Sequence, residues 1–175
     1  DHAGLAVFND GRVLTRELQT KDIICWVLKD GTYTKLWRHH PGPTNGGIGD
    51  RVCHSATTPD ERFVAVLHPG RVLTIDMSTR QGMTTGDCVL VKGSSPGQSI
   101  AISPDGKWSA VTGFLGPQTQ LYQVSNVKAE PSRVLPQTPY VTKDGACAFS
   151  PDSRKVFIGN NDGWVRVFDT ATGEE

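Results

Sequence analysis

Apolar residues along the chain fall into short runs that are separated by turn-forming residues. Val, Ile, Phe, Thr and Trp dominate the runs, and Gly, Pro, Asn and Asp dominate the breaks between them. Half-buried antiparallel strands require this pattern, because β-branched and aromatic side chains suit strands whereas Gly, Pro, Asn and Asp form tight turns. The pattern leaves little room for helices and predicts an all-β chain.

A turn-like quartet recurs four times, and its Asp residues lie 50, 45 and 47 positions apart, at Asp10, Asp60, Asp105 and Asp152. A basic residue follows each Asp by two positions and an alanine precedes it by four. These residues are Arg12, Arg62, Lys107 and Arg154, and Ala6, Ala56, Ala101 and Ala148. A bulky residue recurs 15 to 17 positions after the Asp, as Trp26, Ile75, Tyr122 and Phe168. Several landmarks in one phase define repeats at approximately 1–44, 45–93, 94–138 and 139–175.

Each repeat divides at its turns into three or four short strands. The predicted strands span 5–8, 12–17, 23–28 and 33–38; then 52–57, 62–67, 71–76 and 87–92; then 98–103, 107–112, 119–125 and 132–136; and finally 145–150, 154–159 and 164–169.

Such a repeat cannot bury both faces of its sheet alone, so the copies are expected to stack face to face around an axis. This arrangement is a β-propeller of four blades. The recurrent alanine is expected near the crowded axis, and the bulky residue is expected to fill the gap between neighbouring blades. Because the fourth copy ends after its third strand and no strand precedes Leu5 to complete it, we expect a partial propeller, residues 1–175, within a seven- or eight-bladed ring. The same longer chain or another chain would supply the remaining blades.

The segment Ser103-Pro104-Asp105-Gly106-Lys107 and the stretch from 148 to 173 resemble WD40 repeats. The usual WD40 form runs apolar-Ala-Phe-Ser-Pro-Asp-Gly-Arg, strand, Asp-Gly turn, then Val-Arg-Val-Trp-Asp. The chain lacks the Gly-His and Trp-Asp dipeptides of that family. Of the His, Asp, Ser/Thr and Trp hydrogen-bond network typical of these blades, only Asp162 matches. The resemblance implies a rigid disc that binds partner proteins or peptides.

Charge and composition exclude several other classes. Eighteen basic and eighteen acidic residues cancel without long runs of one sign, which argues against direct nucleic-acid binding. No apolar stretch approaches the roughly 18 residues of a membrane span. The cysteines Cys25, Cys53, Cys88 and Cys147 have no metal-binding spacing and are expected to be buried or half-buried free thiols. This favours an intracellular protein, cytoplasmic or nuclear.

Candidate catalytic chemistry is sparse, so we expect no enzyme, no cofactor and no metal site. Near the predicted axis only His54 is ionisable, and it has no counterpart in the other repeats. His39 and His40 are adjacent in a strand and so point to opposite faces, which disfavours a shared metal. The Gly-rich segment 46–49 lacks a phosphate-binding pattern and is interpreted as a connector.

The sequence therefore favours a non-catalytic interaction scaffold that binds proteins or peptides through its loop face, within a multiprotein complex. The candidate partner-binding residues are aromatic or charged positions in loops and at strand ends: Trp164, Asp162, Tyr140, Asp144, Phe114, Trp37, His39 and His40. The alternative is a fragment of an enzymatic propeller, hydrolase- or lactonase-like, whose metal site lies in other blades, because bacterial propellers share the Ser-Pro-Asp-Gly turn. A complete four-bladed, hemopexin-like disc is a third possibility.

Overall fold

The structure, a computed structural model, describes residues 2–40, 54–68, 71–79, 81–87, 95–114, 119–124, 132–136, 145–159 and 163–175. Within these ranges every regular element of secondary structure is a β-strand, and the strands form four antiparallel sheets. The prediction of an all-β chain with four antiparallel sheets is confirmed.

Each sheet is built from strands that follow one another in the chain and pair in that order. Sheet 1 contains β1 (His2–Val7), β2 (Val13–Glu17), β3 (Ile23–Lys29) and β4 (Thr32–His39). Sheet 2 contains β5 (Ser55–Thr57), β6 (Phe63–His68), β7 (Arg71–Asp76) and β8 (Gln81–Asp87). Sheet 3 contains β9 (Ser95–Ile102), β10 (Trp108–Phe114), β11 (Thr119–Gln123) and β12 (Arg133–Leu135). Sheet 4 contains β13 (Ala146–Phe149), β14 (Lys155–Gly159) and β15 (Val165–Asp169).

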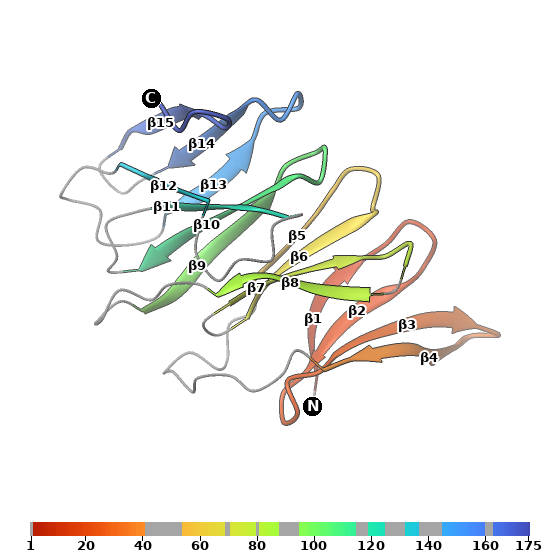
Figure 1. Ribbon diagram of the computed structural model, residues 1–175. Helices are drawn as coiled ribbons and strands as arrows, with labels where there is room; N and C mark the ends of the chain where they lie inside the picture. The colour runs from red at the N-terminus through yellow and green to blue at the C-terminus, as the bar shows by residue number, and fades with distance from the viewer. Residues whose placement is uncertain are drawn as a thin grey trace.

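The four sheets stack in chain order, with the two termini at opposite ends of the stack (Figure 1). The first strands of successive sheets contact each other, β1 with β5, β5 with β9 and β9 with β13. Figure 1 shows the stack open at both ends, with sheet 1 in red and orange and sheet 4 in blue. Sheets 2 and 3 are therefore covered on both faces, whereas sheets 1 and 4 each have one neighbour in the stack.

Apolar clusters fill the three interfaces between neighbouring sheets, and the recurrent bulky residue is central to each. Ile75, Tyr122 and Phe168 are 0%, 1% and 1% exposed. Each packs against residues of the preceding sheet: Ile75 is in one cluster with Leu14, Tyr122 with Ala65 and Phe168 with Ala110. Complete burial of such a side chain contributes roughly 1.5–3 kcal/mol. The expectation that the bulky residue fills the gap to a neighbouring sheet agrees with these contacts for Ile75, Tyr122 and Phe168, whereas Trp26 lines an open pocket.

The recurrent alanine lies on the opposite face of its sheet, toward the next sheet in the stack. Ala6 packs against the cluster between sheets 1 and 2, and Ala56 against the cluster between sheets 2 and 3. Ala101 is 8% exposed, whereas Ala148 is exposed because sheet 4 has no following sheet among the described residues. The alanine is therefore small because two sheets approach closely, and its confinement depends on the neighbouring sheet.

The structure has an edge strand at Gln81–Asp87, six residues ahead of the strand expected over 87–92, and residues 88–92 of that expected strand lie outside the described ranges. Asp76 ends β7 and its carboxylate accepts hydrogen bonds from the backbone and hydroxyl of Ser78 at 2.9 and 2.6 Å. The chain therefore turns early and starts the edge strand at Gln81. The other predicted strands overlap the observed ones.

The turn after β1 is one residue shorter than its counterparts. The Phe8 N–H donates to the Arg12 carbonyl at 2.9 Å, which encloses three residues, whereas the Ser103 N–H donates to the Trp108 carbonyl at 2.8 Å and encloses four. Arg12 therefore occupies the position of Trp108 rather than that of Lys107. Beyond the turn, Val13 pairs with Trp26 as Val64 pairs with Ile75. The bulky residues keep the same place in each sheet.

We predict that Ala101→Leu costs about 1–3 kcal/mol of unfolding free energy, because the larger side chain overfills the gap between sheets 3 and 4. Ala101 pairs with Ala110, whose side chain lies in that interface. The matched control is Ala148→Leu, at the same repeat position on an exposed face, where the change should stay within roughly 0.5 kcal/mol. Urea unfolding midpoints measure both. Equal losses in the two variants would contradict the assigned strand faces.

Candidate interaction site

Large apolar side chains that remain exposed gather mainly at the two ends of the stack. Sheet 1 contributes Val7, Leu28 and Tyr33 on its outer face, at 76%, 49% and 51% exposure. Sheet 4 contributes Trp164 and Val165 at the start of β15, at 68% and 63% exposure. These two regions are the candidate interaction surfaces among the described residues.

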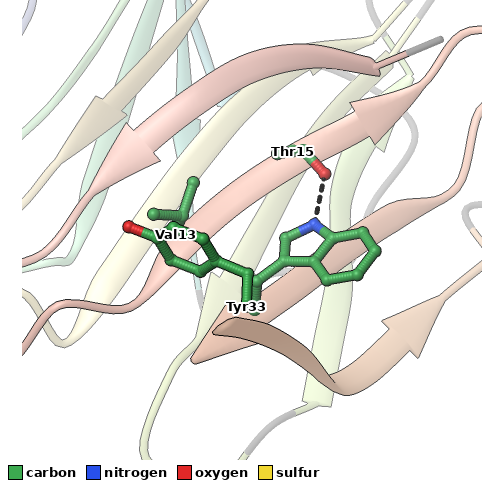
Figure 2. A pocket seen from close by; sticks show the side chains of 4 residues that line it. Val13, Thr15 and Tyr33 are labelled. Carbon is green, nitrogen blue, oxygen red and sulfur yellow. Dashed lines mark hydrogen bonds between the residues drawn. The ribbon is translucent and has the colours of Figure 1, made fainter. Parts of the chain in front are cut away.

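The outer face of sheet 1 contains an apolar pocket of about 410 Å³ (Figure 2). Val13 and Thr15 of β2, Trp26 of β3 and Tyr33 of β4 line it. The indole Nε1 of Trp26 donates a hydrogen bond to Thr15 Oγ1 at 2.8 Å, which fixes the ring across the face of the sheet. The sequence analysis expected Trp26 to fill a gap between blades and did not include it among the candidate site residues. The signal that could have found the pocket is the recurrent bulky position of Trp26, which marks its face of sheet 1 as apolar.

A polar cluster lies at the end of β4, around the carboxylate of Asp22, whose side chain is 5% exposed. His40 Nδ1 lies 2.5 Å from Asp22 Oδ1, and Arg38 Nε lies 3.2 Å from Asp22 Oδ2. Arg38 also bonds Glu17 Oε2 at 3.1 Å. Burial alone raises the pKa of Asp22, but hydrogen bonds from His40 and Thr20 and the charge of Arg38 outweigh it and hold the pKa below its usual value of 3.8. The cluster therefore keeps Asp22 ionised.

Two other predicted site residues lie beside this cluster. His39 is partly buried, and its pKa lies below its usual value because burial and the neighbouring His40 disfavour the charged ring, against an opposing effect of Asp22. Trp37 packs against the cluster between sheets 1 and 2. The structure thus brings Trp37, His39 and His40 together in sheet 1.

The remaining predicted site residues are at a distance from that group or outside the described part. Trp164 directly precedes β15 of sheet 4, and β15 lies at the other end of the stack from sheet 1 (Figure 1). Asp162, Tyr140 and Asp144 lie outside the described residues, and for Phe114 only the backbone, at the end of β10, is described.

The repeated Asp residues are held by hydrogen bonds inside their own turns. Asp105 accepts from Ser103 Oγ at 2.6 Å and from the Lys107 N–H at 3.1 Å, and Ser103 Oγ in turn accepts from the Trp108 N–H at 2.9 Å. The same bonds recur in the turns of sheets 2 and 4, at Thr58 and Asp60, and at Ser150 and Asp152. These carboxylates serve turn geometry.

The described thiols and carboxylates offer no metal centre. Cys25 is a buried free thiol, and burial raises the pKa of the Cys147 thiol to about 12, so that it stays protonated and unreactive at neutral pH. Both match the expected free thiols, whereas Cys53 and Cys88 lie outside the described residues. Across the described ranges, no three His, Cys, Asp or Glu side chains converge as metal ligands. In the same ranges, no helix has the length and apolar character to cross a bilayer.

Comparison with known proteins adds no relationship: no protein-family model matches the chain, and no curated protein is significantly similar to it in sequence.

We predict that the turn carboxylates make folding stability depend on acid pH. Burial opposes ionisation of Asp105, but the bonds from Ser103 and Lys107 outweigh it and lower its pKa below 3.8. The unfolded chain therefore binds more protons in acid. The stabilisation is complete above about pH 4 and is lost as the pH falls through the lowered pKa of the folded state.

Unfolding midpoints measured between about pH 2 and 6 test this dependence. Asp105→Asn should make the acid loss shallower, whereas Ser103→Ala, which removes a donor to the carboxylate, should move the loss toward higher pH. Identical pH profiles for both variants and the parent chain would show that this turn does not contribute.

Proposed function

We propose that the chain is a non-catalytic interaction scaffold, four consecutive blades of a WD40-like β-propeller, that binds partner proteins or peptides through its loop face. The observation that carries the proposal is the exposure of Trp164, at 68%, beside Val165, at 63%. Trp164 directly precedes β15, at the point where this strand of sheet 4 begins. Aromatic side chains at such positions dominate binding when a partner desolvates them.

The repeat positions argue that Trp164 has no role in the stack. Val165, Ile23 and Val72 occupy the same position in the third strand of their sheets, three residues before the recurrent bulky residue. Their partners on the second strand are Gly159, Arg16 and Leu67. Trp164 therefore corresponds to the residues that precede Ile23 and Val72. Those residues, Asp22 and Arg71, are both charged. Stacking of the sheets does not require an aromatic residue at this position, which supports a binding role for Trp164.

Two contacts in sheet 1 support a WD40-like architecture. Trp26 bonds Thr15 at 2.8 Å, and His40 bonds Asp22 at 2.5 Å. These four residues are of the types that form the side-chain network of WD40 blades. In the first repeat the Trp stands at the recurrent bulky position, and the Asp lies between the second and third strands, two positions nearer the third strand than Asp162 is in the fourth repeat.

The scaffold role is supported by how the described polar groups are used. The recurrent turn carboxylates and Ser or Thr hydroxyls bond within their own turns, and the apolar faces are used for stacking. A stack of paired sheets provides a preformed support for the side chains of its strands, which limits the entropic cost of association. The buried Cys25 is in no disulfide, which supports an intracellular location.

We predict that Trp164→Ala weakens binding of a protein partner by about 2 kcal/mol, roughly 30-fold in Kd. The partner is recovered by affinity purification from cells with the parent chain, purified, and titrated calorimetrically against each variant. Thermal stability should change little, since the side chain is mostly exposed.

The matched control is Val134→Ala, an exposed apolar residue of β12 at 44% exposure, which should leave Kd unchanged. Full affinity in Trp164→Ala, or a large loss of its thermal stability, would return Trp164 to a structural role. Calcium or zinc bound stoichiometrically to the purified protein would instead favour the enzymatic alternative.

A further inference from the structure

The outer face of sheet 1 occupies the repeat position of three faces that are buried elsewhere in the stack. Val13 and Trp26 are paired neighbours, as are Val64 and Ile75 in sheet 2. The face of sheet 2 that carries Val64 and Ile75 is the face that packs on sheet 1. In sheet 3, the face that carries the pair Ser109 and Tyr122 packs on sheet 2. In sheet 4, the face that carries the pair Val156 and Phe168 packs on sheet 3. The face of Val13 and Trp26 is therefore one half of an interface between blades.

Exposure at equivalent positions shows that, among the described residues, no sheet covers the part of this face around Leu28, although Ile24, the partner of Thr15, is 1% exposed. Leu28 is 49% exposed, whereas its counterparts Met77 and Val124 are 5% and 4% exposed. Trp26 lines the open pocket, whereas Tyr122 and Phe168 are each 1% exposed. The pocket of about 410 Å³ is therefore the space that a neighbouring sheet fills in the other three interfaces.

The size of the side chain that the missing neighbour presents to Trp26 follows from the existing interfaces, where a large residue faces a small one. The two aromatic residues share their clusters with alanine, Tyr122 with Ala65 and Phe168 with Ala110. The smaller Ile75 shares its cluster with Leu14, at the same repeat position as the two alanines. Trp26 is larger than any of the three. Close packing at constant sheet separation therefore requires alanine or glycine opposite it.

A second copy of this chain does not meet that requirement. Its free end is the outer face of sheet 4, where Phe157 pairs with Val167 as Ala110 pairs with Leu121. Phe157 therefore stands at the repeat position of Ala65 and Ala110. Docking this face on sheet 1 would place Phe157 against Trp26 and overfill the gap.

We propose that the outer face of sheet 1 docks a fifth blade, an antiparallel sheet from outside these 175 residues that presents alanine or glycine opposite Trp26. The inference rests on the proposed propeller architecture and specifies the neighbour of its first blade. The pocket of Trp26 and Tyr33 is then an interface for a β-sheet.

The test adds a blade of the required kind to the full chain. A duplicate of residues 95–144, which carries sheet 3 and its own connector, is fused ahead of Asp1, so that its Ala110 faces Trp26. The matched control carries Ala110→Phe in the added copy only, which reproduces the residue size found at Phe157. Hydroxyl-radical footprinting with mass spectrometry reports the oxidation rates of Trp26 and Leu28.

We expect the added blade to lower the oxidation rates of Trp26 and Leu28 several-fold and to raise the Tm, and the Ala110→Phe control to do neither. Unchanged oxidation with the added blade, or equal protection by both fusions, would overturn the proposal. So would a dimer of the parent chain, seen by light scattering, in which Trp26 is protected, because the occupant would then be a second copy.

A variant of the parent chain keeps the test decisive if a fusion fails to fold. Trp26→Ala should lower the Tm far less than Phe168→Ala, since only Phe168 has its neighbouring sheet in this chain. Equal losses would show that Trp26 is already covered and would overturn the proposal. These outcomes are independent of partner binding through Trp164, so failure here leaves the scaffold function testable by itself.

Discussion

The stack depends on the burial of one bulky third-strand side chain of each sheet against the preceding sheet. Ile75, Tyr122 and Phe168 lose nearly all contact with water, and the residues that face them are sized to match. A sheet of three or four strands with two apolar faces gains this burial only from neighbours, so stability is shared among nearest-neighbour interfaces. The alanines, the spacing of the repeats and the open ends all follow from this requirement.

The turns between first and second strands hold the sheets in register with one another. The bonds of Ser103 and Asp105 set the hairpin that decides which side chains of β9 and β10 face each neighbour. Neighbouring turns are also joined, since the Asp105 N–H donates to Ser153 Oγ at 3.1 Å and the Asn9 N–H to the Glu61 carboxylate at 3.0 Å. A sequence motif that reads as a local turn thus also aligns one sheet with the next.

Periodicity predicted what repeats and missed what occurs once. The four sheets and the bulky position were predictable because each recurs in every copy. The edge strand β8 was not predicted because Gln81–Asp87 is polar and contains two glycines. Arg12 was misaligned because the recurrent Asp hides the shorter turn that follows Phe8. The contact of Asp22 with His40 was not foreseen, since it depends on the pairing of Ile23 with His39 across β3 and β4.

Residue type alone does not separate the two exposed tryptophan surfaces, but repeat position does. Trp26 stands where every other copy fully buries a large side chain, so its half-buried ring in an open pocket indicates a missing sheet. Trp164 stands where the other described copies carry Asp22 and Arg71, so stacking does not explain it. An aromatic side chain that the architecture requires is constrained by its neighbouring sheet. In the proposed scaffold, partner specificity therefore belongs to the surface near Trp164, and the choice of the neighbouring blade to the face of Trp26.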